Sequence, residues 1–313
     1  MTPDLNELTD QLTLTPLQGL GIPVALIGAV FLAVGAQLQH SGVVTVDENS
    51  DTEASKGLSL RQMLALVSRP SWVLGTLMLG LAVLFQLGAL YLAPLIVVQP
   101  LGAVALVITS ILNARISKVE LTRPAIRAIV FCIVGVGIFV TIAAFVAKSK
   151  EVTQQQLVIV LLSLLAITVL FVLAFIFLRK RFKAIIYIVG AGVLYGFVAT
   201  LAKVVIDRLK TLAMGGQDAG GVEWLTALCV LALLAATALG GYFVQTAYSS
   251  GPPDLVIAGL TVIDPIVAVT IGIVVLEEAA GAPWYAILAF GVAAAFAVYG
   301  VFQLAKHHPQ SQH

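Results

Sequence analysis

The sequence predicts an all-α polytopic membrane protein of about nine transmembrane helices, built as two inverted four-helix repeats joined by a connecting helix. Three observations support this prediction. Of the 313 residues, 60% are hydrophobic and 11% are charged, whereas a soluble domain carries about 25% charged residues. The apolar residues gather in long segments. Prolines and polar residues of the first half recur at related positions in the second half.

Nine segments are long and apolar enough to cross a bilayer, which takes roughly 20 residues at about 1.5 Å rise each. They lie near residues 18–40, 72–92, 95–114, 126–147, 156–178, 184–206, 223–248, 254–276 and 283–305. Residues 1–15 lack the basic leader of a secretory signal, so we expect the first segment to stay in the mature protein. With a mean hydropathy of +1.05, the chain leaves only loops and tails outside the membrane.

The distribution of Lys and Arg predicts the orientation, because basic loops stay cytoplasmic. Basic residues cluster in alternate loops, within 56–69, 115–127 and 179–183. We therefore expect an integral protein of the bacterial cytoplasmic membrane, with the N-terminus outside and the C-terminus cytoplasmic. The acidic run at 47–53 then falls in the first cytoplasmic loop, where a solvated linker is expected rather than a metal site.

An internal duplication is indicated by residues 159 positions apart, and by residues 165 apart in the third span of each half. The first set pairs Gln86 with Gln245, Pro94 with Pro253, Pro124 with Pro283 and Phe131 with Phe290; the second pairs Gln99 with Asp264, Pro100 with Pro265, Ala103 with Ala268 and Asn113 with Glu278. The predicted division is an outside tail (1–15), repeat 1 (16–147), a connecting helix and loops (148–183), repeat 2 (184–305) and a cytoplasmic tail (306–313). Equivalent helices are five apart, so the repeats are inverted, as in many secondary transporters that bind substrate near the midplane.

Apart from Arg127, Glu223 and Asp254 at segment ends, two charged residues lie inside the apolar segments, Lys203 and Asp264. An ionisable group at that depth is a functional candidate by default. Lys203 is roughly 13 Å from the middle of its span, so it either extends its ammonium to the interface or contacts the substrate or Asp264. Asp264 lies near the midplane. It is a proton or cation carrier, a neutral acid bonded across helices, or a partner for backbone freed by Pro265.

Uncharged residues complete the candidate site. Pro100, Pro265, Gly102 and Gly259 are candidates for a helix break or hinge, with close packing as the alternative. Glutamines line a polar path or bridge helices, and side chains of other helices are candidate cavity walls; these are Gln86, Gln99, Gln245, Gln37, His40, Tyr195 and Tyr242. The spans contain no metal-ligand spacing, no phosphate-binding glycine loop and no nucleophile beside a base. We therefore expect no enzyme activity, no metal site and no cofactor.

Two sets of motifs carry a resemblance to a known superfamily. The run from Asp264-Pro265 to Ala268, followed by Leu276-Glu277-Glu278, resembles the acid-Pro-x-x-Ala…Leu-Gly-Glu signature of drug/metabolite (EamA-like) transporters, with Glu277 in place of glycine. The first half is similar to the NIPA magnesium-transporter branch through Ala93-Pro94, residues 100–103, Glu120-Leu121 and residues 132–135. The resemblance implies inverted repeats of short helices. The chain has 258–262 (AGLTV) where that branch has Thr-Pro-Ile-Tyr-Tyr, and 37–41 (QLQHS) where it has a lysine cluster.

Together these features predict a secondary transporter, a permease that moves a small organic metabolite or amphiphile by alternating access. Asp264 is the expected coupling or substrate-sensing acid. One central acid among neutral groups makes a weak cation site, since magnesium usually takes carboxylates; transport of magnesium or another divalent cation is therefore the alternative. A non-transporting membrane scaffold is the third hypothesis. The expected partners are the lipid bilayer and a small-molecule substrate or ion, but no nucleic acid, and a homodimer is left open.

Overall fold

The computed structural model describes residues 16–48, 68–116, 118–178, 184–213 and 223–306. Within these residues the chain is helical and contains no strand, and nine helical segments are long and apolar enough to cross a membrane. The predicted fold class is confirmed. The N-terminal tail, most of the acidic run at 47–53, the basic loop at 179–183 and the C-terminal tail from 307 lie outside the described residues.

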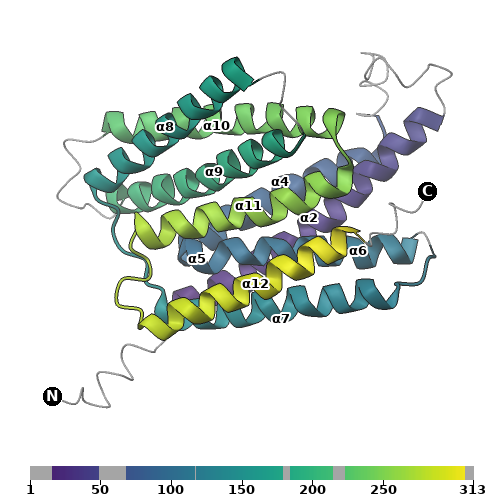
Figure 1. Ribbon diagram of the computed structural model, residues 1–313, viewed down its shortest axis with the longest axis horizontal. Coiled ribbons are helices and arrows are strands. Elements are labelled where there is room, and N and C mark those ends of the chain that lie inside the picture. The colour runs from purple at the N-terminus through teal and green to yellow at the C-terminus, as the bar shows by residue number, and fades with distance from the viewer. Residues whose placement is uncertain (1–15, 49–67, 117, 179–183, 214–222, 307–313) are drawn as a thin grey trace.

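The helices follow the predicted spans to within a few residues at most ends (Figure 1). They are α2 (Pro16–Glu48), α4 (Pro70–Leu92), α5 (Leu95–Val98), the 3-10 helix η1 (Gln99–Leu101), α6 (Gly102–Ile116), α7 (Arg123–Val146), α8 (Gln154–Leu178), α9 (Ala184–Ala213), α10 (Glu223–Ser250), α11 (Pro253–Val274) and α12 (Trp284–Lys306). The third span consists of α5, η1 and α6 together. The largest differences are at α2 and α9, which extend beyond the predicted ends at 40 and 206.

The helices associate mainly in pairs. α2 packs on α4, α7 packs on α12, and α9 packs on both α10 and α11, while α8 lies at the edge beside α9 and α10 (Figure 1). Lipid removes the hydrophobic driving force between helices, so small residues that permit close contact stabilise such pairs. A Cβ at Gly75 on α4 would lie 2.8 Å from the Gly35 carbonyl oxygen of α2. Gly35 and Gly75 therefore permit the close packing of α2 on α4.

α7 and α12 cross as an antiparallel pair at two glycines that have reciprocal surroundings. A Cβ at Gly135 would collide with the backbone nitrogen of Ala297, and a Cβ at Gly300 would collide with that of Cys132. Gly300 lies 165 positions after Gly135, and Ala297 lies 165 positions after Cys132, so the same offset relates the two contacts to each other. The crossing therefore has a local two-fold relation, which supports the predicted repeat. The inverted orientation of the complete repeats stays a prediction.

This relation changes the alignment of the fourth span in each half. Phe131 and Phe296 stack with ring centroids 5.9 Å apart and lie 165 positions apart, on the local axis. The crossing thus equates Phe131 with Phe296, whereas the offset of 159 had paired it with Phe290. Phe290 instead packs against Phe139, 4.9 Å away between centroids. In the fourth span the aligned prolines therefore favour an offset of 159, whereas the crossing favours 165, the offset of the third span.

The two prolines of the third and eighth spans have different local structures. Pro100 lies in the 3-10 helix η1, which interrupts the third span between α5 and α6. α11 is one continuous helix that contains both Gly259 and Pro265, so the interruption expected at Pro265 is not observed. A Cβ at Gly259 would collide with Ile188 of α9, so Gly259 permits close packing. Among the described residues, no neighbour lies within 4 Å of a Cβ at Gly102. Hinge motion at these positions stays a prediction.

Candidate functional site

A polar cavity of about 340 Å³ lies between α2, α4, the η1–α6 junction and α11. It brings together Gln86 of α4, Gln99 of η1 and Asp264 of α11, three of the residues predicted from the sequence. Thr261, Gly102 and Pro265 also line it. Its walls come from both predicted repeats, and an open cavity at this position argues against a scaffold packed solid through its centre.

Asp264 and Gln99 each present an unpaired polar atom in this region. Among the described residues, the buried Oδ1 of Asp264 and the buried Nε2 of Gln99 have no hydrogen-bond partner. A buried polar atom without a partner costs roughly 1–3 kcal/mol, and such atoms are usually satisfied by water, an ion or a ligand. Within the described chain, Oδ1 of Asp264 accepts no hydrogen bond from the backbone near Pro265. An acceptor oxygen and an amide donor of two residues at the cavity wall are therefore left without a partner within the described chain.

The backbone around Asp264 is held closely against α9. A Cβ at Gly196 would lie 3.0 Å from the Asp264 carbonyl oxygen, and one at Gly192 would lie 2.7 Å from the Ile263 side chain. Because two glycines of α9 permit this approach, the position of the Asp264 turn depends on α9.

Other predicted site residues lie elsewhere. Gln245 and Tyr242 are exposed on α10, Tyr242 by 60%. Tyr195 is half-buried beside Gly240 of α10 and lies within electrostatic reach of Asp264. Gln37 lines a second cavity next to the first. Gln245 and Tyr242 therefore do not contribute to the cavity around Asp264.

Lys203 lies in a buried polar cluster at one end of the bundle. It is 1% exposed, so the expected extension to the membrane interface is wrong. Its Nζ donates to the carbonyl oxygens of Leu90 (2.8 Å) and Ala93 (3.2 Å), to Ser149 Oγ (3.1 Å) and to Asp207 Oδ1 (3.1 Å). The ammonium thus binds the C-terminal end of α4 and pairs with Asp207, not with Asp264.

Glu278 belongs to the same buried end and is 3% exposed. Its Oε1 accepts from the backbone nitrogen of Leu95 at 2.8 Å and its Oε2 from that of Ile96 at 2.9 Å. These are first-turn amides of α5, which have no partner inside the helix. Burial raises the pKa of Glu278 to about 7, against the opposing effects of the Lys203 charge and the two amides.

Sequence reasoning used Glu278 in the repeat alignment and in the family motif but not as a site residue, because it lies beyond the last apolar residue of its span. Asp207 could have been found from its spacing, since a carboxylate four residues after Lys203 lies on the same helical face. The Thr261 contribution to the cavity has no comparable signal in the sequence.

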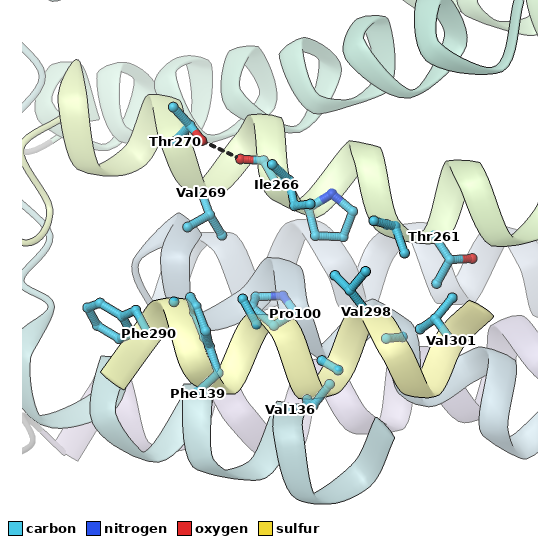
Figure 2. A pocket seen from close by; sticks show the side chains of 16 residues that line it. Pro100, Val136, Phe139, Thr261, Ile266, Val269, Thr270, Phe290, Val298 and Val301 are labelled. Carbon is cyan, nitrogen blue, oxygen red and sulfur yellow. Dashed lines mark hydrogen bonds between the residues drawn. The ribbon is translucent and has the colours of Figure 1, made fainter. Parts of the chain in front are cut away.

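A third cavity, of about 250 Å³, is apolar (Figure 2). It lies between α11 and the α7–α12 pair and is lined by Pro100, Phe139, Phe290 and Val298. The Thr270 hydroxyl, at its edge, donates to the Ile266 carbonyl oxygen at 2.7 Å and so is already partnered. This cavity shares Thr261 and Pro265 with the polar one. It adds apolar space beside the Asp264 site without further charge.

Apolar membrane-spanning helices around a cavity with a buried carboxylate define a membrane transporter. The chain belongs to the family of NIPA magnesium transporters, whose family model, described as "Magnesium transporter NIPA", matches residues 17–218. This family is a branch of the drug/metabolite superfamily, as the motifs had indicated. The match runs from α2 to just beyond α9. Asp264 and the other α11 residues that line the polar cavity lie outside the matched range.

An uncharacterised protein of Corynebacterium glutamicum is 26% identical over 259 residues, which cover 83% of this chain and 85% of that protein. No solved structure matches the chain significantly.

Proposed function

We propose that the protein is a secondary transporter of magnesium or a closely related divalent cation, with Asp264 as the acid that binds the cation or its water shell. The observation that carries the proposal is the unpaired, buried Asp264 oxygen in a polar cavity, in a chain of the NIPA family. Magnesium sites commonly use one or two carboxylates and keep several bound waters. A single carboxylate therefore suffices for a magnesium site where amide and hydroxyl oxygens accept hydrogen bonds from those waters.

The chain's own residues contribute in distinct ways. Asp264 supplies negative charge where a cation loses bulk water. The Gln86 and Gln99 side chains offer amide oxygens to metal-bound water, and the free Gln99 amide nitrogen donates to a carboxylate or water oxygen. Movement of the two inverted units about this position, with Pro100 and Pro265 near the centre, gives alternating access. The N-terminus lies outside and the C-terminus in the cytoplasm, as the basic loops indicate.

Flux measurements on the full chain in liposomes test the proposal. Wild-type protein should carry magnesium, detected by a trapped fluorescent indicator, and Asp264→Asn should reduce the flux at least tenfold. Glu151→Gln, which makes the same kind of change at an exposed loop residue, should transport normally. Full flux in a correctly folded Asp264→Asn variant would remove Asp264 from the mechanism.

Transport of a small organic metabolite or amphiphile is the second candidate. The apolar cavity that adjoins the polar one favours it, since an amphiphile would place its polar group at Asp264 and its apolar group against Phe139 and Phe290. Labelled metabolites screened beside magnesium in the same liposomes separate the two functions. Metabolite uptake without magnesium flux would replace the cation proposal.

A further inference from the structure

A second polar cavity, of about 480 Å³, lies next to the Asp264 cavity on the side of the α10–α11 junction. Five of its lining side chains carry neutral amide or hydroxyl groups and come from four helices. They are Gln37 of α2, Thr109 and Asn113 of α6, Tyr248 of α10 and Thr261 of α11. Asn113 is 3% exposed, so its amide lies inside the protein, whereas Tyr248 is 40% exposed.

The two cavities meet at a shared set of residues. Leu32, Gly102 and Thr261 line both. A Cβ at Gly102 would meet no atom of the described part of the chain within 4 Å, so the junction is open at this position. Polar groups therefore follow one another from Asn113 and Tyr248, past Thr261, to Asp264.

The chemistry and size of this second cavity match a cation that keeps its water. Magnesium is octahedral and loses its waters reluctantly. Six waters at about 30 Å³ each occupy roughly 180 Å³, which is less than either polar cavity. Amide and hydroxyl oxygens accept hydrogen bonds from metal-bound waters, so the lining needs no further carboxylate.

We propose that this cavity is a vestibule that binds a divalent cation with its water shell intact, through hydrogen bonds to Gln37, Asn113 and Tyr248, before the ion reaches Asp264. This inference rests on the proposed function. It adds that the cation binds in its hydrated form, and it names the residues that bind it. These residues contact the waters of the cation and not the metal itself. Binding in the vestibule therefore does not require exchange of metal ligands.

Cobalt(III) hexaammine tests this, because its ammonia ligands do not exchange and it binds only through their hydrogen bonds. It should bind the full-length protein in nanodiscs and compete with magnesium for flux in proteoliposomes. The probe should still bind Asp264→Asn, whose flux is lost. Tyr248→Phe and Gln37→Leu should each weaken binding about tenfold, as for one hydrogen bond to a charged group. Asn113→Ala should do the same, with its thermal unfolding measured in parallel.

Thr237→Val is the matched control, since it removes an exposed hydroxyl from α10, the helix of Tyr248. It should leave probe binding unchanged. The vestibule would be overturned if the wild type carries magnesium, cobalt(III) hexaammine does not inhibit this flux and the protein does not bind the probe. Magnesium transport itself would then still stand. Absence of magnesium flux in the wild type would instead defeat the proposed function. Equal probe affinity in the wild type and in folded Tyr248→Phe and Gln37→Leu variants would also overturn the vestibule.

Discussion

Lys203 and Glu278 stabilise opposite sides of the same tight turn, Ala93–Pro94, which joins α4 to α5. Lys203 binds carbonyl oxygens at the C-terminal end of α4, and Glu278 binds amide nitrogens at the N-terminal end of α5. A cation at a helix C-terminus and an anion at an N-terminus each match the helix dipole. The two side chains come from repeat 2 and hold a turn of repeat 1, so this cluster joins the predicted units at one end of the bundle.

Breaking the cluster from the lysine side should destabilise the protein. Lys203→Met leaves Asp207 and two carbonyl oxygens without their donor, and loss of one partner from a buried ion pair costs roughly 3–5 kcal/mol. Thermal unfolding in detergent measures the effect. In the Lys203→Met/Asp207→Asn double variant, the loss should be smaller than the sum of the two single losses. Additive losses would show that the two side chains do not interact energetically.

Stability should also depend on pH through Glu278. Its raised pKa of about 7 means that the folded protein binds this proton more tightly than the unfolded chain. Its contribution is thus fully present below the ordinary pKa of 4.5 and is lost as the pH rises through about 7. Unfolding temperatures measured from pH 8 to pH 5 should rise more in the wild type than in Glu278→Gln. An identical pH profile in both proteins would contradict this prediction.

Replacing Glu277 by glycine should stabilise the folded protein. Glu277 has φ of 55°, in the left-handed region, where a side chain costs roughly 1–2 kcal/mol. The superfamily signature has glycine at this position, and the backbone conformation supplies the reason. Glu277→Gly also loses an ion pair with Lys150, but both side chains are about half exposed and such pairs contribute little. We expect a gain of about 1 kcal/mol in unfolding free energy. The control is Lys150→Gln, which removes the ion pair alone and should change stability little.

The α7–α12 crossing should not tolerate a methyl group. Gly135→Ala places a Cβ against the α12 backbone, and overpacking of this kind costs roughly 1–3 kcal/mol. Gly137→Ala, two residues further along the same helix, meets no atom within 4 Å and should be neutral or slightly stabilising. Comparing their unfolding temperatures separates helix propensity from contact. Equal effects at both positions would show that the crossing is looser than the structure describes.

The sequence alone was sufficient for the class of protein and for most helix ends, although α2 and α9 extend beyond the predicted ends at 40 and 206. In lipid, backbone groups must bond within their own helix, so length and apolarity predict a span with little need of tertiary information. The same local signals found Asp264 and the Gln99–Pro100 pair, because a polar residue at membrane depth is conspicuous.

Tertiary structure alone decided which way each side chain points. Helices that are apolar all round carry no pattern that distinguishes an inner face. The sequence therefore could not predict that Gln86 lines the cavity while Gln245, its predicted counterpart, lies on the exposed surface. Lys203 was placed correctly along its helix but assigned the wrong environment. Except for Asp207 on the same helix, its partners come from the end of α4 and from the loop before α8. Contacts between distant segments are set by packing, which no local pattern of residues contains.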